Sequence, residues 1–482
     1  MDIPYKADLD VIHFNFYETE LRRNTIYNHD ESEKIITETL SLIYQISDIV
    51  SYSEDFIKLC NTLCDACFSF TGSLTNIIPK ECVTFFFQLI HTENQYELNN
   101  VIINLLFVFT KDLQIKQYLF SLGVINMMFH LFEIDKSYFV LACNILGIYM
   151  IESPTEIQEF IMNFKFQNKP KRFFKYLLFY VNNLSLENQL FAHSALFLLS
   201  QVIVYFKISN EQLSLITNAI INRFCVIQNE TDINDCVYVF YCLIKIYPEN
   251  MLLFSQTKVL LALASFLKMN FSEPIFINLL ILLQNILSVD GVHITYFMPL
   301  FDLFSFLVST LGKPSNLDHT SNLDDTSHLI NSSYSVIKTT LKVLHFAIIH
   351  IPTLADFLVI SKVNFLELLA NLYENCTFNQ KKYVMIVISD LLIKSGIEIA
   401  ITVLKSDIFS ILISSVEQFS EEYSHVLFNG MFNLLGRMNE NQISQIDVLL
   451  KITIENLSNA QSPYIQKMSQ IIQESLDISL DK

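Results

Sequence analysis

Apolar residues recur with the period of an α-helix along most of this chain. Three such segments follow one another at residues 100–109, 124–132 and 139–150, with apolar side chains three or four positions apart. Short polar stretches such as Tyr247–Asn250 separate the segments, and Ser, Asn or Asp often precedes the apolar run, as helix N-termini require. The pattern predicts a chain built almost entirely of helices. Further segments of this kind lie at 190–205, 211–224, 235–247, 257–268, 275–289, 293–311, 334–350, 363–373, 382–394, 407–416, 424–438, 443–456 and 463–479.

The predicted helices come in pairs, and the second helix of a pair returns at intervals of roughly 40–50 residues. A helical hairpin of this size cannot bury its apolar face alone, so neighbouring pairs must stack and share a core. We therefore expect an all-α fold, a right-handed α–α superhelix, over residues 34–482. The more polar residues 1–33 are expected to form an N-terminal arm or an irregular cap.

Glycine is scarce in this sequence. The chain has 8 glycines in 482 residues, whereas average usage of about 7% would give roughly thirty. β-Sheets, barrels and nucleotide-binding α/β folds need glycine for turns and phosphate loops, so these classes are disfavoured. The sequence also contains no phosphate-loop, zinc-protease or nucleophile-elbow motif. These absences predict a protein that is not an enzyme and that binds no cofactor.

Three cysteines raise the question of a metal site. Cys60, Cys64 and Cys67 match the spacing of radical-SAM iron–sulfur ligands, but they also form one stripe of a helix. Cysteine is a common buried residue, so core packing is the favoured interpretation. Zinc is not expected either, because no second cysteine pair or histidine pair follows at ligand spacing.

Charge bears on the class of partner. The formal net charge is −18, which argues against nucleic acid or an anionic membrane and favours a basic protein segment. Within this acidic chain, five basic residues lie close together. They are interpreted as a contact patch for an acidic partner, as an internal signal segment, or as a solvated loop that leads into a helix. These residues are Lys165, Lys169, Lys171, Arg172 and Lys175.

Cysteine usage and hydropathy indicate the compartment. The 9 cysteines are odd in number and irregularly spaced, which is typical of a reduced intracellular chain. The first ten residues contain no apolar run, so no secretory signal is predicted. The longest uncharged stretch, residues 188–206, carries several polar side chains and is interpreted as a buried helix rather than a membrane span. We expect a cytoplasmic protein.

One segment interrupts the helical pattern. Residues 313–333 are rich in Ser, Asn and Asp, and a six-residue unit recurs in them as SNLDHT and SNLDDT. Their apolar residues are too few to pack, so a disordered surface loop is predicted. Its role is left open between a docking or modification site and an insertion that the fold tolerates at little cost.

Residues 117–151 resemble an armadillo repeat. A short helix ends at Leu122, Gly123 occupies the position of the glycine between the first and second helices, and a second and a third helix follow. The same pattern returns at 358–396 and 403–438, where Lys362 and Asp407 replace the glycine. The resemblance implies an armadillo-like or HEAT-like solenoid.

Within that family, the order of features between Pro79 and Pro154 is similar to the early repeats of importin-α. The resemblance implies a peptide groove along the third helices, where importin-α carries a Trp and, four residues later, an Asn. The matching pairs here are Asn104/Val108, Cys143/Gly147, Phe197/Gln201, Ile281/Asn285 and Asn433/Arg437. Only Asn285 keeps the family residue, and the chain has no Trp. The candidate groove residues are Asn104, Gln201, Asn285, Asn433 and Arg437.

These features together predict a protein that binds another protein. The finer expectation is a divergent importin-α-like nuclear import adaptor, which holds a partner segment on its concave face and shuttles between cytoplasm and nucleus. The alternative is a structural subunit that scaffolds a larger complex.

Overall fold

Helices form every regular element of the described chain. The structure, a computed structural model, is all-α in the residues that it describes. The predicted fold class, an α-helical solenoid, is confirmed, whereas the hand of its superhelix stays a prediction. The described residues are 29–46, 54–90, 96–134, 138–150, 173–183, 189–227, 229–248, 257–288, 301–311, 334–361 and 364–480.

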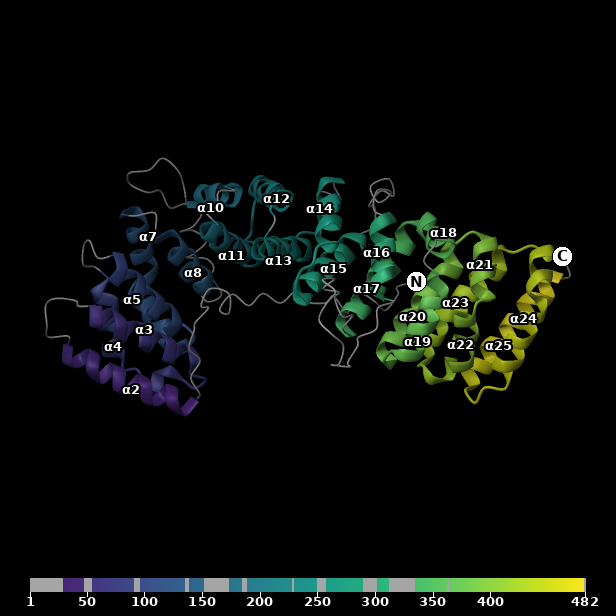
Figure 1. Cartoon of the computed structure of the whole chain (residues 1–482), viewed down its shortest axis with the longest axis horizontal. Helices are drawn as coiled ribbons and strands as arrows, with labels where there is room; N and C mark the ends of the chain where they lie inside the picture. Colours follow the sequence, from purple (N-terminus) through teal and green to yellow (C-terminus); the bar gives the residue numbers. More distant parts are fainter. Residues whose placement is uncertain are drawn as a thin grey trace, which may run out of the picture. The chain divides into compact units, whose positions relative to one another are not determined.

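The chain divides into two compact units, of which the first extends from His13 to Ile246. Its elements run from purple to teal in Figure 1. They are α2 (His29–Ile46), α3 (Glu54–Ser69), η2 (Leu74–Asn76), α4 (Lys80–Leu89), α5 (Tyr96–Phe109), α6 (Leu113–Ser121), α7 (Val124–Ile134), α8 (Phe139–Tyr149), α10 (Phe173–Asn182), α11 (Gln189–Tyr205), α12 (Asn210–Phe224) and α13 (Glu230–Ile246).

The second unit contains the chain from Tyr247 onward. Its elements run from teal through green to yellow in Figure 1. They are α14 (Thr257–Leu267), α15 (Glu273–Leu287), α16 (Phe301–Leu311), α17 (Tyr334–His350), α18 (Pro352–Ile360), α19 (Phe365–Asn375), α20 (Phe378–Lys394), α21 (Ile397–Leu404), α22 (Asp407–Ser415), η8 (Val416–Gln418), α23 (Glu421–Arg437), α24 (Glu440–Ser458) and α25 (Pro463–Leu480).

Helices α6, α7 and α8 form the three-helix repeat that was expected near residues 117–151. The Asp112 side chain caps α6 by accepting hydrogen bonds from the backbone N–H groups of Gln114 (3.0 Å) and Ile115 (3.3 Å). After α6, Gly123 adopts a φ of 85°, a left-handed conformation that strains any residue with a Cβ. The chain then enters α7 at once, so the predicted place of Gly123 between the first two helices is confirmed.

Two further three-helix repeats lie where the sequence predicted them. Helices α18, α19 and α20 cover the expected repeat at 358–396, and α21, α22 and α23 cover the one at 403–438. Asp407 begins α22 directly after its N-cap residue Ser406, so the helix starts there without a glycine. Lys362 lies outside the described residues.

The third helix of a repeat lies deep in the core. Every residue of α8 is buried, which explains why its sequence is apolar on all sides rather than on one face. The ring of Phe139 lies 5.5 Å from Phe132 and 4.4 Å from Tyr180, measured between ring centroids. These rings belong to α7 and α10, so aromatic packing ties one repeat to the next.

Two arginines bind the C-terminal ends of helices in the preceding repeat. Arg223 donates hydrogen bonds to the carbonyl oxygens of Val181 and Asn183, each at 3.1 Å. Arg437 donates to the carbonyl oxygens of Leu392 and Ser395, the latter at 2.9 Å. The last carbonyls of a helix have no partner within the helix, so a cation from the next repeat satisfies them.

The predicted N-terminal arm and the predicted loop lie largely outside the described residues. Helix α2 begins at His29, within the stretch 1–33 that was assigned to the arm. Residues 1–28 and the predicted loop at 313–333 are not described, so both assignments stay predictions. The 9 cysteines all lie in the described chain, and all are free thiols.

No single helix in the described chain is long and apolar enough to cross a membrane. The pair Ile397–Leu404 and Asp407–Gln418 reaches the necessary length and composition only when its two parts, bent by 60°, are joined.

Candidate functional site

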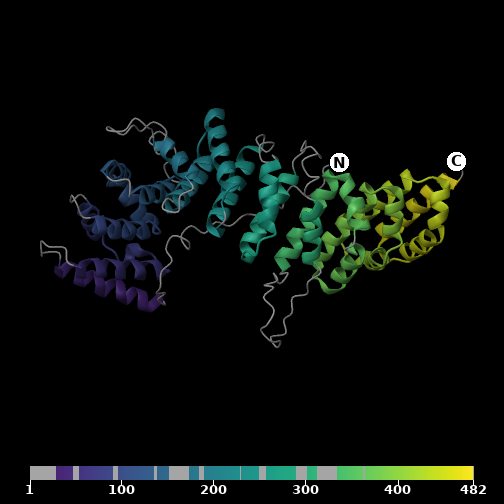
Figure 2. The same cartoon turned by 45° about the horizontal axis from the view of Figure 1, so that its top comes forward.

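Long helices pack side by side in a row within each unit. In the first unit, this inner row consists of α3, α5, α8, α11 and α13, in that order; in the second unit, it consists of α15, α17, α20, α23 and α25. Figure 1 shows neighbouring members of a row, such as α20 and α23, next to each other, and Figure 2 shows the green and yellow helices of the second unit packed side by side. Each repeat adds one helix to the row, so equivalent positions recur one repeat apart. The inner row is where the resemblance places a peptide groove.

A buried histidine–aspartate pair joins neighbouring helices of the row in each unit. His193 of α11 is hydrogen-bonded to Asp235 of α13. In the second unit, Nδ1 of His345 on α17 lies 2.6 Å from Oδ2 of Asp390 on α20. Burial raises the pKa of Asp390, and the adjacent His345 acts in the opposite direction. His193 is 6% exposed, so Asp235 satisfies a polar side chain in the core.

The five candidate groove residues do not share one environment. Asn104 on α5 and Gln201 on α11 are half-buried, and the Gln201 amide donates a hydrogen bond to Ser200 Oγ at 3.3 Å. Asn285 on α15 is 2% exposed, and its Nδ2 atom has no hydrogen-bond partner in the described chain. Asn433 is exposed on α23, and Arg437 binds the end of α20. Asn433 and Arg437 stand one helical turn apart on α23.

Core packing occupies part of the predicted groove. The position that matches the family Asn on α8 is Gly147, and a Cβ atom there would collide with the ring of Phe197 on α11. Phe197, which matches a family Trp, is itself buried. This part of the row therefore joins two repeats, because the glycine lets the Phe197 ring lie against α8.

A patch of amides and tyrosines lies on α11 and α13. Gln201 and Tyr205 stand one helical turn apart on α11, as Asn234 and Tyr238 do on α13. Tyr205 is exposed, and the other three are half-buried. Burial raises the pKa of Tyr238, and the nearby Cys242 and Tyr205 add to the rise. We call these four residues the amide–tyrosine patch. Of these four residues, only Gln201 was predicted as a groove residue, although the i+4 spacing could have indicated Tyr205.

In the second unit, the chain's own lysines cover the tyrosines of the inner row. Lys342 Nζ of α17 lies 5.5 Å from the ring centroid of Tyr383 on α20. Lys382 Nζ of α20 lies 4.5 Å from the ring of Tyr423 on α23. These cation–π contacts use the ring faces that a basic ligand would need.

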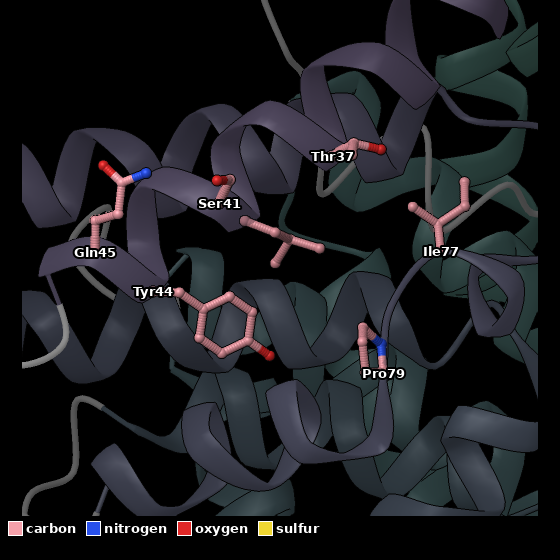
Figure 3. A pocket seen from close by; sticks show the side chains of 7 residues that line it. Thr37, Ser41, Tyr44, Gln45, Ile77 and Pro79 are labelled. Atoms are coloured by element: carbon pink, nitrogen blue, oxygen red, sulfur yellow. The ribbon is translucent and has the colours of Figure 1, made fainter.

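A groove lies beside α2 in the first unit, with a volume of about 490 Å³ (Figure 3). In Figure 3, the Tyr44 ring forms one wall, and Ile77 and Pro79 face it from the segment before α4. We call this cavity the α2 groove. Its lining residues are Thr37, Leu40, Ser41, Tyr44, Gln45, Ile77 and Pro79.

The cysteine stripe lies in the core of the first unit. Cys60, Cys64 and Cys67 are all buried on α3, as core packing predicts. Burial raises the pKa of the Cys60 thiol to about 12, with smaller contributions from Cys64 and Cys82, so it is a poor thiolate donor. The described residues contain no group of three or more His, Cys, Asp or Glu side chains that could hold a metal ion.

Most of the predicted basic patch cannot be placed. Lys175 is exposed on α10. Lys165, Lys169, Lys171 and Arg172 lie outside the described residues, so the patch stays a prediction.

The fold is similar to that of an engineered protein solved by the Northeast Structural Genomics Consortium. The TM-score is 0.57 at 12% identity, over 93% of this chain and 99% of that one. At this identity, the likeness concerns the fold alone.

Two designed armadillo repeat proteins also match, each over 62% of this chain. One has 18% identity and a TM-score of 0.35 over 98% of its own chain. The other, in complex with the peptide (KR)4, has 17% identity and a TM-score of 0.37 over 97% of its chain. TM-scores this low do not support a conclusion about the fold or function of this chain. No protein-family model matches the chain. The search of curated proteins found no match.

Proposed function

We propose that this chain is a non-catalytic protein-binding scaffold that holds a segment of a partner protein against the amide–tyrosine patch. The observation that carries the proposal is the placement of Gln201 and Tyr205 next to Asn234 and Tyr238 on neighbouring helices. Side-chain amides can both donate to and accept from a peptide backbone. Tyrosine rings take apolar or cationic side chains.

The proposed partner segment is basic. The net charge of −18 favours a basic ligand by long-range attraction. The amide–tyrosine patch is the better place for it, because Lys342 and Lys382 already lie over the tyrosines of the second unit and would repel it. The finer proposal is an importin-α-like import adaptor that works in the cytoplasm and nucleus. The three-helix repeats and the sequence resemblance support this role.

Peptide binding by the purified full chain tests the proposal. We expect a fluorescent Lys/Arg-rich peptide to bind, and an acidic peptide of the same length to bind far more weakly. The double variant Gln201→Ala/Tyr205→Ala should weaken binding about tenfold, equivalent to about 1.4 kcal/mol. Tyr334→Ala is a matched control, because Tyr334 is an exposed tyrosine in the second unit. Equal affinity of all three proteins would refute the proposed site.

Affinity capture from native cells tests the import role separately. Transport factors and proteins with basic tails should be enriched, and the double variant should lose them. Capture of membrane-trafficking or cytoskeletal proteins alone would argue against nuclear import.

A second candidate function is permanent assembly in a larger complex, as a scaffold subunit. It is favoured by Val448 and Ile452, which stand one turn apart on α24 and are 72% and 52% exposed. Exposed apolar residues on one helix face are typical of an assembly surface. Light scattering tests this function: the isolated chain should self-associate, and Val448→Lys/Ile452→Lys should return it to the monomer. A wild-type chain that stays monomeric would argue against permanent assembly through Val448 and Ile452.

A further inference from the structure

Two neighbouring helices of the second unit's inner row repeat the same pair of an aromatic residue and a lysine. On α17, Lys338 follows Tyr334 by four residues. On α20, Lys382 follows Phe378 by four residues, and residues at this spacing lie on one helix face. The Gln380 side chain donates a hydrogen bond to the Tyr334 carbonyl oxygen at 3.4 Å, so the two helices begin side by side. We call the four paired residues the aromatic–lysine surface: Tyr334, Lys338, Phe378 and Lys382.

The aromatic residues of this surface offer apolar area to a ligand. Tyr334 is 42% exposed and Phe378 is 47% exposed. Phe378 stacks on Phe419, with 5.3 Å between the ring centroids and 16° between the ring planes. A ring that is already held by a neighbour loses little conformational freedom when a ligand binds. The surface is therefore suited to apolar or aromatic side chains of a partner.

Two lysines of α20 are positioned by aromatic rings rather than by carboxylates. Nζ of Lys382 lies 4.9 Å from the ring centroid of Phe378 and 4.5 Å from that of Tyr423 on α23. Nζ of Lys381 lies 4.8 Å from the ring centroid of Tyr373 on α19. No ion pair within the described chain includes Lys381 or Lys382. An ammonium group over a ring keeps N–H donors for a carboxylate, so both lysines can bind an anionic ligand without breaking an ion pair.

Positive charge dominates helices α17 and α20. Their only acidic residue is Asp390, which is 6% exposed and hydrogen-bonded to His345. The next helix of the inner row, α23, carries the exposed Glu421 and Glu422 in its first turn. Burial raises the pKa of Tyr464 on α25, and Glu421 adds to the rise, which places Glu421 near α25. The aromatic–lysine surface is thus locally basic in a chain whose net charge is −18.

We propose that the aromatic–lysine surface binds an acidic segment of a partner protein that also carries aromatic or other apolar side chains. The carboxylates pair with Lys338 and Lys382, and the apolar side chains pack on Tyr334 and Phe378. Packed helices lie about 8–10 Å apart, a distance that an extended chain covers in about three residues at about 3.3 Å each. Acidic residues three positions apart therefore meet successive lysines. This binding goes beyond the proposed recognition of a basic segment by the amide–tyrosine patch and does not depend on it.

A protein segment fits this surface better than a single-stranded nucleic acid, although lysines and aromatic rings suit both. A nucleic acid carries a negative charge on every nucleotide, so a chain of net charge −18 repels it along its whole length. A short acidic segment has only a few carboxylates, and salt screens their interactions beyond about 8–10 Å. Exposed ion pairs alone contribute little, so an acidic segment without apolar side chains should bind weakly.

Fluorescence anisotropy tests the proposal with the purified full chain and a labelled peptide that repeats Asp-Phe-Ser four times. We expect saturable binding, and about tenfold weaker binding of a peptide that repeats Asp-Ser-Ser, which has the same charge and no aromatic residue. Lys338→Gln/Lys382→Gln should weaken binding of the Asp-Phe-Ser peptide about tenfold. Lys338→Arg/Lys382→Arg keeps both charges and should retain the affinity. Urea denaturation of both variants should match the wild type, which separates lost binding from lost folding.

The matched control is Lys405→Gln/Lys467→Gln, which removes the same charge at two exposed lysines elsewhere in the second unit. It should bind the Asp-Phe-Ser peptide as the wild type does. Gln201→Ala/Tyr205→Ala should also bind it normally, so failure of the amide–tyrosine patch and failure of this surface are distinguishable. Equal affinity of the wild type and the glutamine variant of the surface would overturn the proposal. So would tighter binding of a single-stranded oligouridylate than of the peptide, because the surface would then be a nucleic-acid site.

Discussion

Nδ1 of His345 lies 2.6 Å from Oδ2 of Asp390, and the two buried residues are separated by 45 positions in the chain. His193 and Asp235, separated by 42 positions, form the corresponding pair in the first unit. Both separations equal about one repeat, and both pairs join neighbouring helices of an inner row. A buried polar pair is satisfied in only one register, so it specifies how one repeat stacks on the next.

Removing the acceptor of this pair should destabilise the second unit. Asp390→Ala removes the acceptor that faces Nδ1 of His345 in the core, at a cost of about 1–3 kcal/mol. Asp390→Asn should cost less, because its amide oxygen still accepts the hydrogen bond. Urea denaturation measures both, and equal losses in the two variants would show that the hydrogen bond itself contributes little.

The N-cap of α6 should give stability that depends on pH. Burial raises the pKa of Asp112, but hydrogen bonds from Ser73, Thr75 and the backbone of Ile115 outweigh this and lower it from 3.8 to about 2. A carboxyl group whose folded pKa is depressed stabilises the fold above its unfolded pKa, and this contribution is lost as the pH falls toward the folded value. Denaturation of wild type and Asp112→Asn should therefore show a stability gap at pH 6 that narrows below pH 4, in the range of the shift from 3.8 to about 2. A gap that stays constant with pH would contradict this assignment.

The contact between Gly147 and Phe197 should be sensitive to one methyl group. Gly147→Ala brings its Cβ into the Phe197 ring, and overpacking of this kind costs about 1–3 kcal/mol. Phe197→Leu in the same chain should recover part of the loss. Gly436→Ala is the matched control, because a Cβ at that helical glycine meets nothing within 4 Å. It should stabilise by about 0.5–1 kcal/mol. Thermal unfolding should be measured for Gly147→Ala, for Gly147→Ala with Phe197→Leu, and for Gly436→Ala. Equal changes in stability for the two glycine substitutions would contradict the proposed clash.

Arg437 should act on stability rather than on ligand binding. Arg437→Gln removes charged hydrogen bonds to the end of α20, which we expect to cost about 1–2 kcal/mol. Asn433→Ala, one turn earlier on α23 and exposed, should change stability by less than about 0.5 kcal/mol. Chemical denaturation and peptide binding should be measured on both variants. If Arg437→Gln lost peptide binding but kept its stability, Arg437 would be a ligand-binding residue of the groove, as the resemblance implied.

Much of the fold could be predicted because the helices are long and strongly periodic. The helices themselves followed from local pattern, since helix periodicity is a property of short stretches. The place of Gly123 between two helices and the repeats at 358–396 and 403–438 followed from the resemblance to armadillo repeats. The candidate site could be predicted only in part. Gln201 was identified from the family register, whereas Tyr205 and Tyr238 were missed because importin-α carries its aromatic residue before the amide, and here it follows.

The sequence by itself determined that this chain forms stacked helical repeats. The helical period of the apolar residues depends on neighbours a few positions apart, and the scarcity of glycine disfavours the fold classes that need it. Only the tertiary structure decided what the inner rows contain. Phe197 lies against Gly147, and Lys382 lies over Tyr423, across 50 and 41 residues of chain respectively. Such pairs depend on the register in which neighbouring helices pack, because a shift of one residue in this register would replace every contact between two repeats.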